Sequence, residues 1–187
     1  MVTTNASLYT EAKKVSSIMK FTAQIYPVPF HTCETIDLYL DKAVPEIRFQ
    51  YIRISQAELE KPLLNLKIDT EGSPFKQVMT LDKFLFAGFG SQFIVFDLEH
   101  LKLISQMEFG GYFGSFSMDK EDIFIATDSE IYKLNLAGEL IWKAGNLGID
   151  DVILHNLAPD EIHGSGEWDP PGGWEDFILD RESGKKK

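Results

Sequence analysis

The chain has 187 residues, and its 18 Lys and Arg against 29 Asp and Glu give a formal net charge of −11. This length suits one domain or two small ones with a buried core, and 44% hydrophobic residues are typical of a globular protein rather than a disordered one. The acidity argues against nucleic-acid binding, which needs basic side chains to neutralise phosphates. The single cysteine, Cys33, excludes an internal disulfide framework and favours a reducing compartment.

The N-terminal segment, residues 1–20, predicts a short helix. Leu8, Ala12, Val15 and Met19 recur at helical spacing, and Asn5 can cap the helix. The segment lacks the apolar run of a secretion signal, and nowhere do about 18 consecutive apolar residues predict a membrane span. We therefore expect a cytoplasmic protein that begins with a short helix and does not enter a membrane.

The N-terminal part also contains two strand-like runs, residues 21–26 and 47–52. Residues 56–67, interrupted by Pro62, are expected to form a connector. We expect residues 1–75 to form the helix and a diverged strand region. This region is expected to make one continuous unit with a repeat region over residues 76–187.

The repeat region consists of short runs of Phe, Ile, Leu and Val separated by Gly and Asp, which are typical of strands and tight turns. Three units begin at Phe84, Ile123 and Glu161, so their starts recur at nearly equal intervals along the chain. The third unit is extended by an insertion at residues 166–174. A repeat of this period with several strands in each unit predicts β-propeller blades.

The predicted fold class is therefore mostly β, with about three recognisable propeller-like blade repeats and a short N-terminal helix. Three units are too few to close a ring, since propellers need about four or more blades. The open sheet edges need a cover. Either residues 21–54 supply a diverged fourth blade or the missing outer strand, or two chains join edge to edge as a homodimer.

Residues 134–143, Leu-Asn-Leu-Ala-Gly-Glu-Leu-Ile-Trp-Lys, resemble the quinoprotein-like (PQQ-type) β-propeller repeat. In that repeat a strand ends in Asp or Asn, and a Gly turn and a strand bearing Trp follow. Residues 179–185 carry the first half of the pattern, whereas the first unit has Asp97 but no turn glycine. The whole segment, with Gly-Glu-Trp-Asp-Pro-Pro-Gly-Gly-Trp at residues 166–174, also resembles uncharacterised bacterial propeller-like proteins.

This resemblance covers roughly residues 76–185 and implies a fold rather than an activity. It does not imply the quinone cofactor, because family members that bind it use a full ring of many blades. We therefore expect no cofactor.

The charge is unevenly distributed. Residues 1–80 hold nine acidic and nine basic side chains, whereas residues 81–187 hold twenty acidic and nine basic. Between Asp150 and Glu182 there are ten carboxylates and a single cation, Arg181. Such a local field attracts cationic molecules, although acidic loops are also commonly just solvated. We expect a non-enzymatic interaction protein whose acidic C-terminal third engages a cationic protein partner, for example as an immunity-like inhibitor of a basic toxin.

The inserted loop is the most specific local feature. Its prolines fix the backbone, its glycines allow tight turns, and its tryptophans provide flat surfaces beside carboxylates. The candidate binding residues are Glu167, Trp168, Asp169, Trp174, Glu175 and Asp176. The loop can instead be a rigid corner whose rings cover the blade core. The alternative function is a small-molecule or carbohydrate binder, or a hydrolase, that uses the Trp168–Trp174 loop.

No motif indicates catalytic residues or a metal site. The sequence has no Gly-x-Ser-x-Gly, its histidines lack zinc-ligand spacing, and Cys33 has no partner cysteine. Asp150-Asp151 and Asp160-Glu161 offer oxygen ligands but lack the spacing of a calcium loop. These observations favour a non-enzymatic protein without deciding the question.

Overall fold

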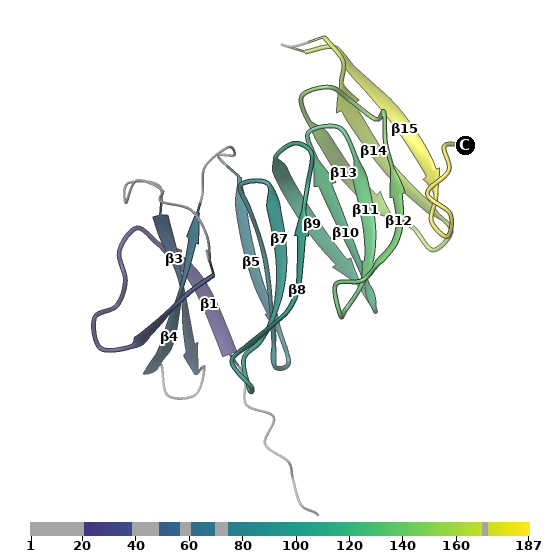
Figure 1. Cartoon of the computed structure of the whole chain (residues 1–187). Coiled ribbons are helices and arrows are strands. Elements are labelled where there is room, and N and C mark those ends of the chain that lie inside the picture. Colours follow the sequence, from purple (N-terminus) through teal and green to yellow (C-terminus); the bar gives the residue numbers. More distant parts are fainter. Residues whose placement is uncertain (1–20, 39–48, 57–60, 70–74, 170–171) are drawn as a thin grey trace, which may run out of the picture.

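The structure, a computed structural model, describes residues 21–38, 49–56, 61–69, 75–169 and 172–187. Every regular element within these residues is a β-strand, and the strands form four sheets that follow one another in chain order (Figure 1). In this part of the chain, no helix is long and apolar enough to cross a membrane. The helix expected over residues 1–20 lies outside the described residues.

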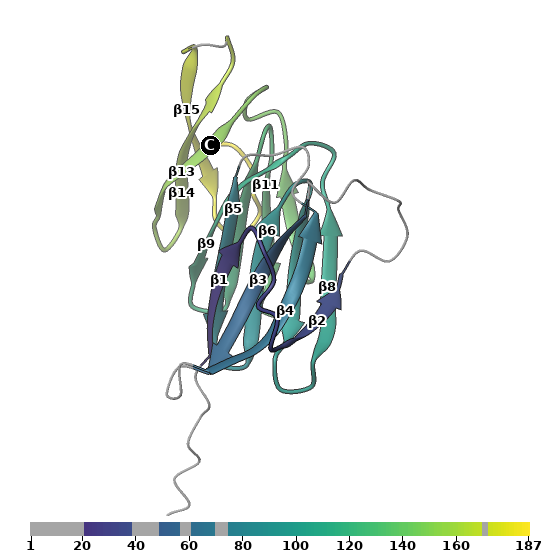
Figure 2. The ribbon, with the colours of Figure 1, turned by 90° about the vertical axis from the view of Figure 1, so that its left-hand side faces the viewer.

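The first sheet has the strand order β1-β3-β4-β2 and is not a simple meander. Its strands are β1 (Phe21–Tyr26), β2 (Glu34–Asp37), β3 (Phe49–Gln56) and β4 (Lys61–Asp69). β2 pairs with β4 in parallel, whereas the other neighbours are antiparallel. The segment from β1 to β2 therefore has to reach the opposite edge of the sheet, and Figure 2 shows it passing in front of the sheet.

The second and third sheets are four-stranded antiparallel meanders. The second contains β5 (Lys76–Leu81), β6 (Phe84–Phe89), β7 (Gln92–Asp97) and β8 (Lys102–Glu108). The third contains β9 (Phe113–Asp119), β10 (Asp122–Thr127), β11 (Ile131–Asn135) and β12 (Leu140–Ala144).

The fourth sheet contains β13 (Val152–Leu157), β14 (Glu161–Glu167) and β15 (Trp174–Asp180). A single bridge between Leu179 and Lys186 extends its outer edge. The starting strands β1, β5, β9 and β13 of the four sheets contact one another in sequence. The described strands thus form four consecutive blades of a propeller-like fold.

The sheets are held together by apolar side chains on both faces of the middle two. In β6, Leu85 and Ala87 pack against the first sheet, whereas Phe86 packs against the third. In β10, Ile123 packs against the second sheet and Phe124 against the fourth. Because successive strand residues point to opposite faces, a strand buried on both sides reads as a continuous apolar run.

The repeats that the sequence predicts are present, but their register is shifted in one unit. The second strands of the three later sheets begin at Phe84, Asp122 and Glu161, so the middle start is one residue earlier than predicted. A shift of one residue exchanges the two faces of a strand. Both faces of β10 carry apolar residues, so the sequence shows no alternation of polar and apolar residues from which the first residue of the strand could be predicted.

The described residues before residue 70 correct a second prediction. They form a complete four-stranded sheet, as expected of a diverged fourth blade. The connector predicted at residues 56–67 is wrong, because β4 starts at Lys61 and includes Pro62. The register between β3 and β4 shifts between Ile54 and Ser55, next to the Ser55–Pro62 pair. A bulge of this kind is where a strand tolerates a proline.

The hairpins after β7, β11 and β15 share one turn device. Asp97, Asn135 and Asp180 end these strands, and one side-chain oxygen of each accepts backbone N–H groups two to four residues further on, at 2.8–3.0 Å. Such Asx turns fix a hairpin locally. They give a physical reason for the strand-ending Asp or Asn of the predicted repeat pattern.

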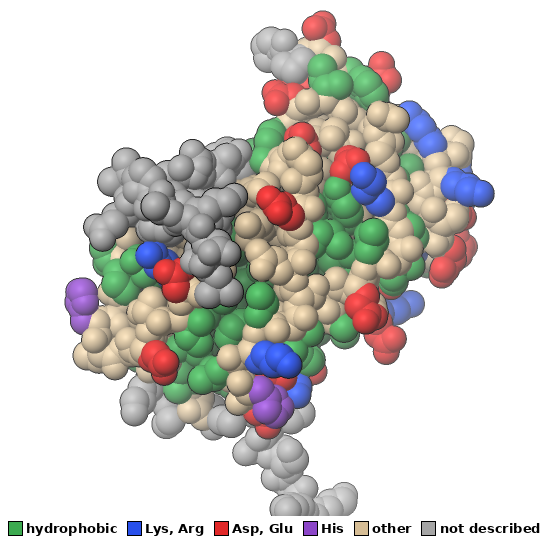
Figure 3. All heavy atoms as spheres, viewed as in Figure 1, with side chains coloured by type: hydrophobic (Ala, Val, Ile, Leu, Met, Phe, Trp, Pro, Cys, Tyr) green, Lys and Arg blue, Asp and Glu red, His purple; other side chains and the backbone are tan. Residues whose placement is uncertain are grey.

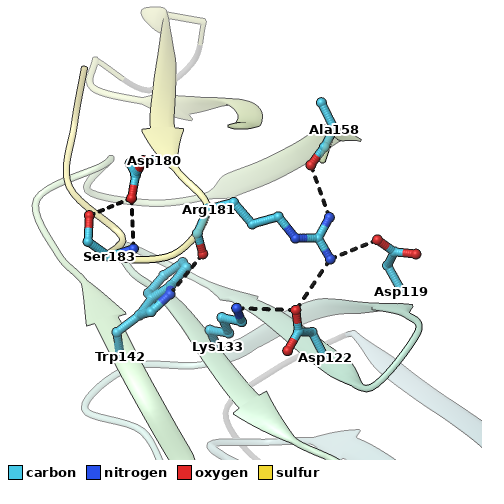
Figure 4. A network of polar contacts seen from close by, with 8 residues as sticks. All are labelled: Asp119, Asp122, Lys133, Trp142, Ala158, Asp180, Arg181 and Ser183. Carbon is cyan, nitrogen blue, oxygen red and sulfur yellow. Dashed lines mark hydrogen bonds and ion pairs between the residues drawn. The ribbon is translucent and has the colours of Figure 1, made fainter. Parts of the chain in front are cut away.

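The third and fourth sheets are also joined by a polar network around Arg181 (Figure 4). The guanidinium group is buried, and it donates to the Ala158 carbonyl at 3.0 Å and pairs with Asp119 at 2.7 Å and Asp122 at 3.4 Å. The buried Lys133 ammonium lies 3.2 Å from the same Asp122 carboxylate. Two cations and two carboxylates thus neutralise one another between the sheets.

Removing Arg181 is expected to destabilise the fold. Arg181→Ala leaves the Ala158 carbonyl and the two carboxylates without their shared donor, and should lower the free energy of unfolding by roughly 1–3 kcal/mol. Urea denaturation measures this. The control Lys187→Ala removes an exposed ion pair with Glu161 and should leave stability almost unchanged. Equal losses in both variants would contradict a special role for the network.

Candidate functional site

Four carboxylates gather near Tyr112 at one end of the third and fourth sheets. Burial raises the pKa of Tyr112 to about 12, and the negative charges of Asp150, Asp151, Asp128 and Glu167 add to this rise. We call these five residues the acidic cluster. They lie at strand ends, because Tyr112 precedes β9, Asp128 follows β10, Asp150 and Asp151 precede β13, and Glu167 ends β14.

Backbone hydrogen bonds hold these segments together. The N–H of Asp128 donates to the Tyr112 carbonyl at 3.2 Å. The N–H of Ile149 donates to the Glu167 carbonyl at 2.8 Å, and the N–H of Glu167 donates to the Asp151 carbonyl at 2.9 Å. Backbone hydrogen bonds thus bring together the segments that carry Asp128, Asp151 and Glu167.

A glycine allows the closest of these approaches. A Cβ atom on Gly166 would lie 1.7 Å from the Leu147 carbonyl oxygen, so only glycine fits against the β12–β13 connection at this point. Close packing against the Leu147 carbonyl therefore explains why the end of β14 carries a glycine at position 166.

The carboxylates of the acidic cluster repel one another. Burial raises the pKa of Asp151, and the charges of Glu167 and Asp150 raise it further, against a hydrogen bond of 2.9 Å from the Val152 N–H. Folding thus holds these negative charges closer together than they would lie in an unfolded chain. This repulsion lowers the stability of the folded chain, and such a loss of stability is common at functional surfaces.

The chain supplies no cation next to these carboxylates in sequence. Residues 144–176 contain neither Lys nor Arg. The preceding Lys143 pairs with Glu130 at 2.7 Å. Figure 3 shows acidic side chains at the uppermost end of the molecule, where the β14–β15 hairpin has its tip. The local field at this end is therefore negative.

The six binding residues predicted from sequence are only partly brought together. Glu167 belongs to the acidic cluster and also accepts the Gly172 N–H at 2.8 Å. Trp174 lies opposite Glu167 in the β14–β15 ladder and is 41% exposed. Asp176 lies on the same face of β15 as Trp174, whereas Glu175 points to the other face.

The other two predicted residues lie in the loop itself. The Trp168 N–H donates to the Gly173 carbonyl at 2.8 Å, and the Gly173 N–H donates to the Asp169 carbonyl at 3.1 Å. The Trp168 side chain is partly buried, and that of Asp169 is exposed. Of the two indoles at the described ends of the loop, that of Trp174 is therefore the more accessible.

A separate group of side chains that could ligate a metal, Asp97, Glu99 and His100, lies in the β7–β8 turn. The Lys83 ammonium occupies it, at 3.3 Å from Asp97 and 3.5 Å from Glu99. Burial opposes ionisation of Asp97, but hydrogen bonds from His100, Glu99 and Lys83 outweigh it and hold the pKa of that carboxyl below its usual range. The group is explained as a charged hairpin turn.

Neutralising one member of the acidic cluster should stabilise the protein. The raised pKa of Asp151 means that stability is fully present below its ordinary pKa of about 3.8 and declines as the pH rises through the folded-state value. Asp151→Asn keeps an oxygen for the Val152 N–H. It should therefore raise the free energy of unfolding at neutral pH by less than about 1 kcal/mol, and this gain should disappear near pH 3.

Urea denaturation at both pH values tests this expectation. Asp169→Asn removes an equal charge from an exposed position and serves as the control. A loss of stability for Asp151→Asn at neutral pH would show that the carboxylate is needed for folding.

Comparison of the sequence with models of known protein families gives no match, and comparison with curated proteins gives none either. Among solved structures, the chain is similar to Sqt1 of Saccharomyces cerevisiae, with a TM-score of 0.53 and 12% identity over 70% of this chain and 38% of that chain. It is also similar to the computationally designed protein Ika8, with a TM-score of 0.51 and 11% identity over 80% of this chain and 46% of that chain.

The WD40 domain of Pan2 from Neurospora crassa aligns with a TM-score of 0.48 and 10% identity, over 73% of this chain and 45% of that chain. The chain thus spans less than half the length of each of these structures. At such low identities the similarity concerns the fold alone. Together with the four stacked sheets, the similarity to Sqt1 and Ika8 supports a propeller-like fold.

Proposed function

We propose that this chain is a non-enzymatic interaction module whose acidic cluster engages a cationic protein partner. The observation that carries the proposal is the set of carboxylates held together near Tyr112, in a stretch of chain that supplies no Lys or Arg over residues 144–176. An arginine or lysine from a partner would relieve their repulsion on binding. Such complementarity mainly raises the association rate and the specificity of a complex.

The surroundings of the acidic cluster fit a protein partner. Tyr112 is partly buried, and Trp174 exposes 41% of its surface at the base of the neighbouring loop. Aromatic rings beside carboxylates can receive the flat face of a guanidinium group as well as its charge. An immunity-like inhibitor that covers the basic surface of a toxin is one concrete form of this proposal.

We also propose three more specific properties that the sequence predicts. These are a quinoprotein-type variant of the propeller repeat in a bacterial protein, a cytoplasmic location in keeping with the lone Cys33, and a homodimer joined at sheet edges. Light scattering of the free chain tests the last, since a mass of one chain would remove the dimer.

A hexa-arginine peptide is a suitable probe of the acidic cluster. Calorimetry should detect binding at low salt that weakens steadily as ionic strength rises. The double variant Asp150→Asn/Asp151→Asn should reduce affinity on the order of tenfold. Binding that is indifferent to salt would contradict the proposal.

The matched control is Glu121→Gln/Glu182→Gln. It removes the same charge from exposed turns at the opposite end of the strands. It should retain most of the wild-type affinity. An equal loss in both double variants would mean that only net charge matters and that the acidic cluster is not a site.

The second candidate is a small-molecule or carbohydrate binder, or a hydrolase, that uses the Trp168–Trp174 loop. The exposed indole of Trp174 beside Glu167 favours it, because an accessible ring next to a carboxylate can stack on a sugar. Binding of this kind would respond little to salt, which separates it from the first candidate.

The two tryptophans should differ when each is changed to alanine. Trp168→Ala removes a partly buried ring and should lower the melting temperature, whereas Trp174→Ala removes an exposed ring and should leave it nearly unchanged. Thermal unfolding followed by circular dichroism measures both. A large fall for Trp174→Ala would favour the interpretation of the loop as a structural corner.

A further inference from the structure

The face of the first sheet that points away from the second sheet carries an arginine between two aromatic rings. Ile52 and Ile54 of β3 are buried against the second sheet, so Arg53 between them points to the opposite face. Its guanidinium carbon lies 3.7 Å from the ring centroid of Tyr26 and 4.7 Å from that of Phe30. Both distances are within the range of a cation–π contact.

The two rings are held in place by hydrogen bonds of their own. Asn65, which is fully buried, accepts the Phe30 N–H through Oδ1 at 3.1 Å and donates to the Phe30 carbonyl through Nδ2 at 3.1 Å. The Tyr26 hydroxyl donates to the side-chain oxygen of Gln24. The segment that carries Phe30 is the one that passes in front of the sheet in Figure 2. The rings are therefore positioned before any ligand arrives.

Within the described residues, Arg53 lacks the anionic partner that such a residue normally has. Its Nε is enclosed there without a hydrogen-bond partner, and no ion pair of Arg53 is found among these residues. Arg181, the other arginine that the structure describes, has two carboxylates and a carbonyl. In a chain with 29 acidic residues, a carboxylate for Arg53 would have been easy to supply. Arg53 as a whole is only partly buried, but a buried donor such as its Nε costs stability when it has no hydrogen-bond partner.

The geometry points to an anion site at Arg53 that takes the carboxylate of an acidic side chain from a partner protein. The two terminal nitrogens of an arginine form a planar fork that matches a carboxylate, and rings on its faces direct the ligand into the guanidinium plane. The cross-strand neighbours of Arg53 on β1 and β4 are the neutral Gln24 and Asn65.

A protein source is favoured over a small anion by the residues nearby. Val28, in the crossing segment, is 59% exposed, and Leu63, at the bulge of β4 two residues before Asn65, is 39% exposed. Exposed aliphatic side chains around an arginine and two aromatic rings have the composition of a protein-interaction hot spot. This surface lies on the first sheet and does not depend on the acidic cluster of the third and fourth sheets.

The test follows the Nε–H resonance of Arg53 by NMR in the full chain. Enclosure of Nε slows its exchange with water, so the resonance should be visible, and Arg181 supplies an internal reference. Titration with a hexaglutamate peptide should shift the Arg53 signal to saturation and leave the Arg181 signal unmoved. The net charge of −11 disfavours non-specific accumulation of a glutamate peptide. The amide resonances of Lys102, Lys120 and Gly184 report any binding at exposed lysines away from Arg53.

Two variants and one further probe complete the test. Arg53→Lys keeps the charge without the fork and should weaken peptide binding at least about tenfold. Phe30→Leu keeps an apolar cover but removes one ring, and should weaken binding if that ring aligns the guanidinium group. Equal affinity in Arg53→Lys, equal shifts of Arg53 and Arg181, or an equal response to inorganic phosphate would each overturn the carboxylate assignment.

Discussion

The structure depends on apolar side chains that fill the spaces between successive sheets. The two middle sheets are covered on both faces, so the central strands, such as β6 and β10, have almost no solvent-facing residues. Charged and polar groups are consequently displaced to the strand ends and to the outer faces of the first and last sheets. Both proposed sites lie in these places, one at strand ends and one on an outer face. The packing of the sheets thus determines where charged and polar side chains can be accessible to a ligand.

The sequence allowed the strands of residues 76–187 to be predicted because turn residues interrupt short apolar runs. It also allowed the hairpin pattern to be recognised, since Asn135 and Asp180 fix their turns through local hydrogen bonds. The register of β10 was not predictable, because Ile123 and Phe124 are equally apolar and face different sheets. β4 was missed because Pro62 normally interrupts a strand, and only the neighbouring bulge makes it acceptable.

The candidate site was less predictable than the fold. Glu167 was identified because it belongs to an unusual loop, and the concentration of charge after Asp150 indicated the region. Tyr112 and Asp128 were not identified, because they reach the acidic cluster from other connections and no local pattern marks them. Their shared position at one end of adjacent strands is the only signal, and it becomes visible once the register is known. Arg53 and its two rings were likewise hidden, since they come from β1, a connecting segment and β3.

The crossing segment of the first sheet has a consequence for the order of assembly. β2 precedes β3 and β4 in the chain but pairs only with β4, in parallel. It therefore has no partner until the β3–β4 hairpin exists, and a parallel pairing of this kind closes a longer loop than a hairpin does. Asn65, on β4, then secures the segment through Phe30 and also donates to Thr35 of β2. Closure of the chain over the arginine thus requires β4 to be in place, and local opening there can release the segment while the core behind it stays intact.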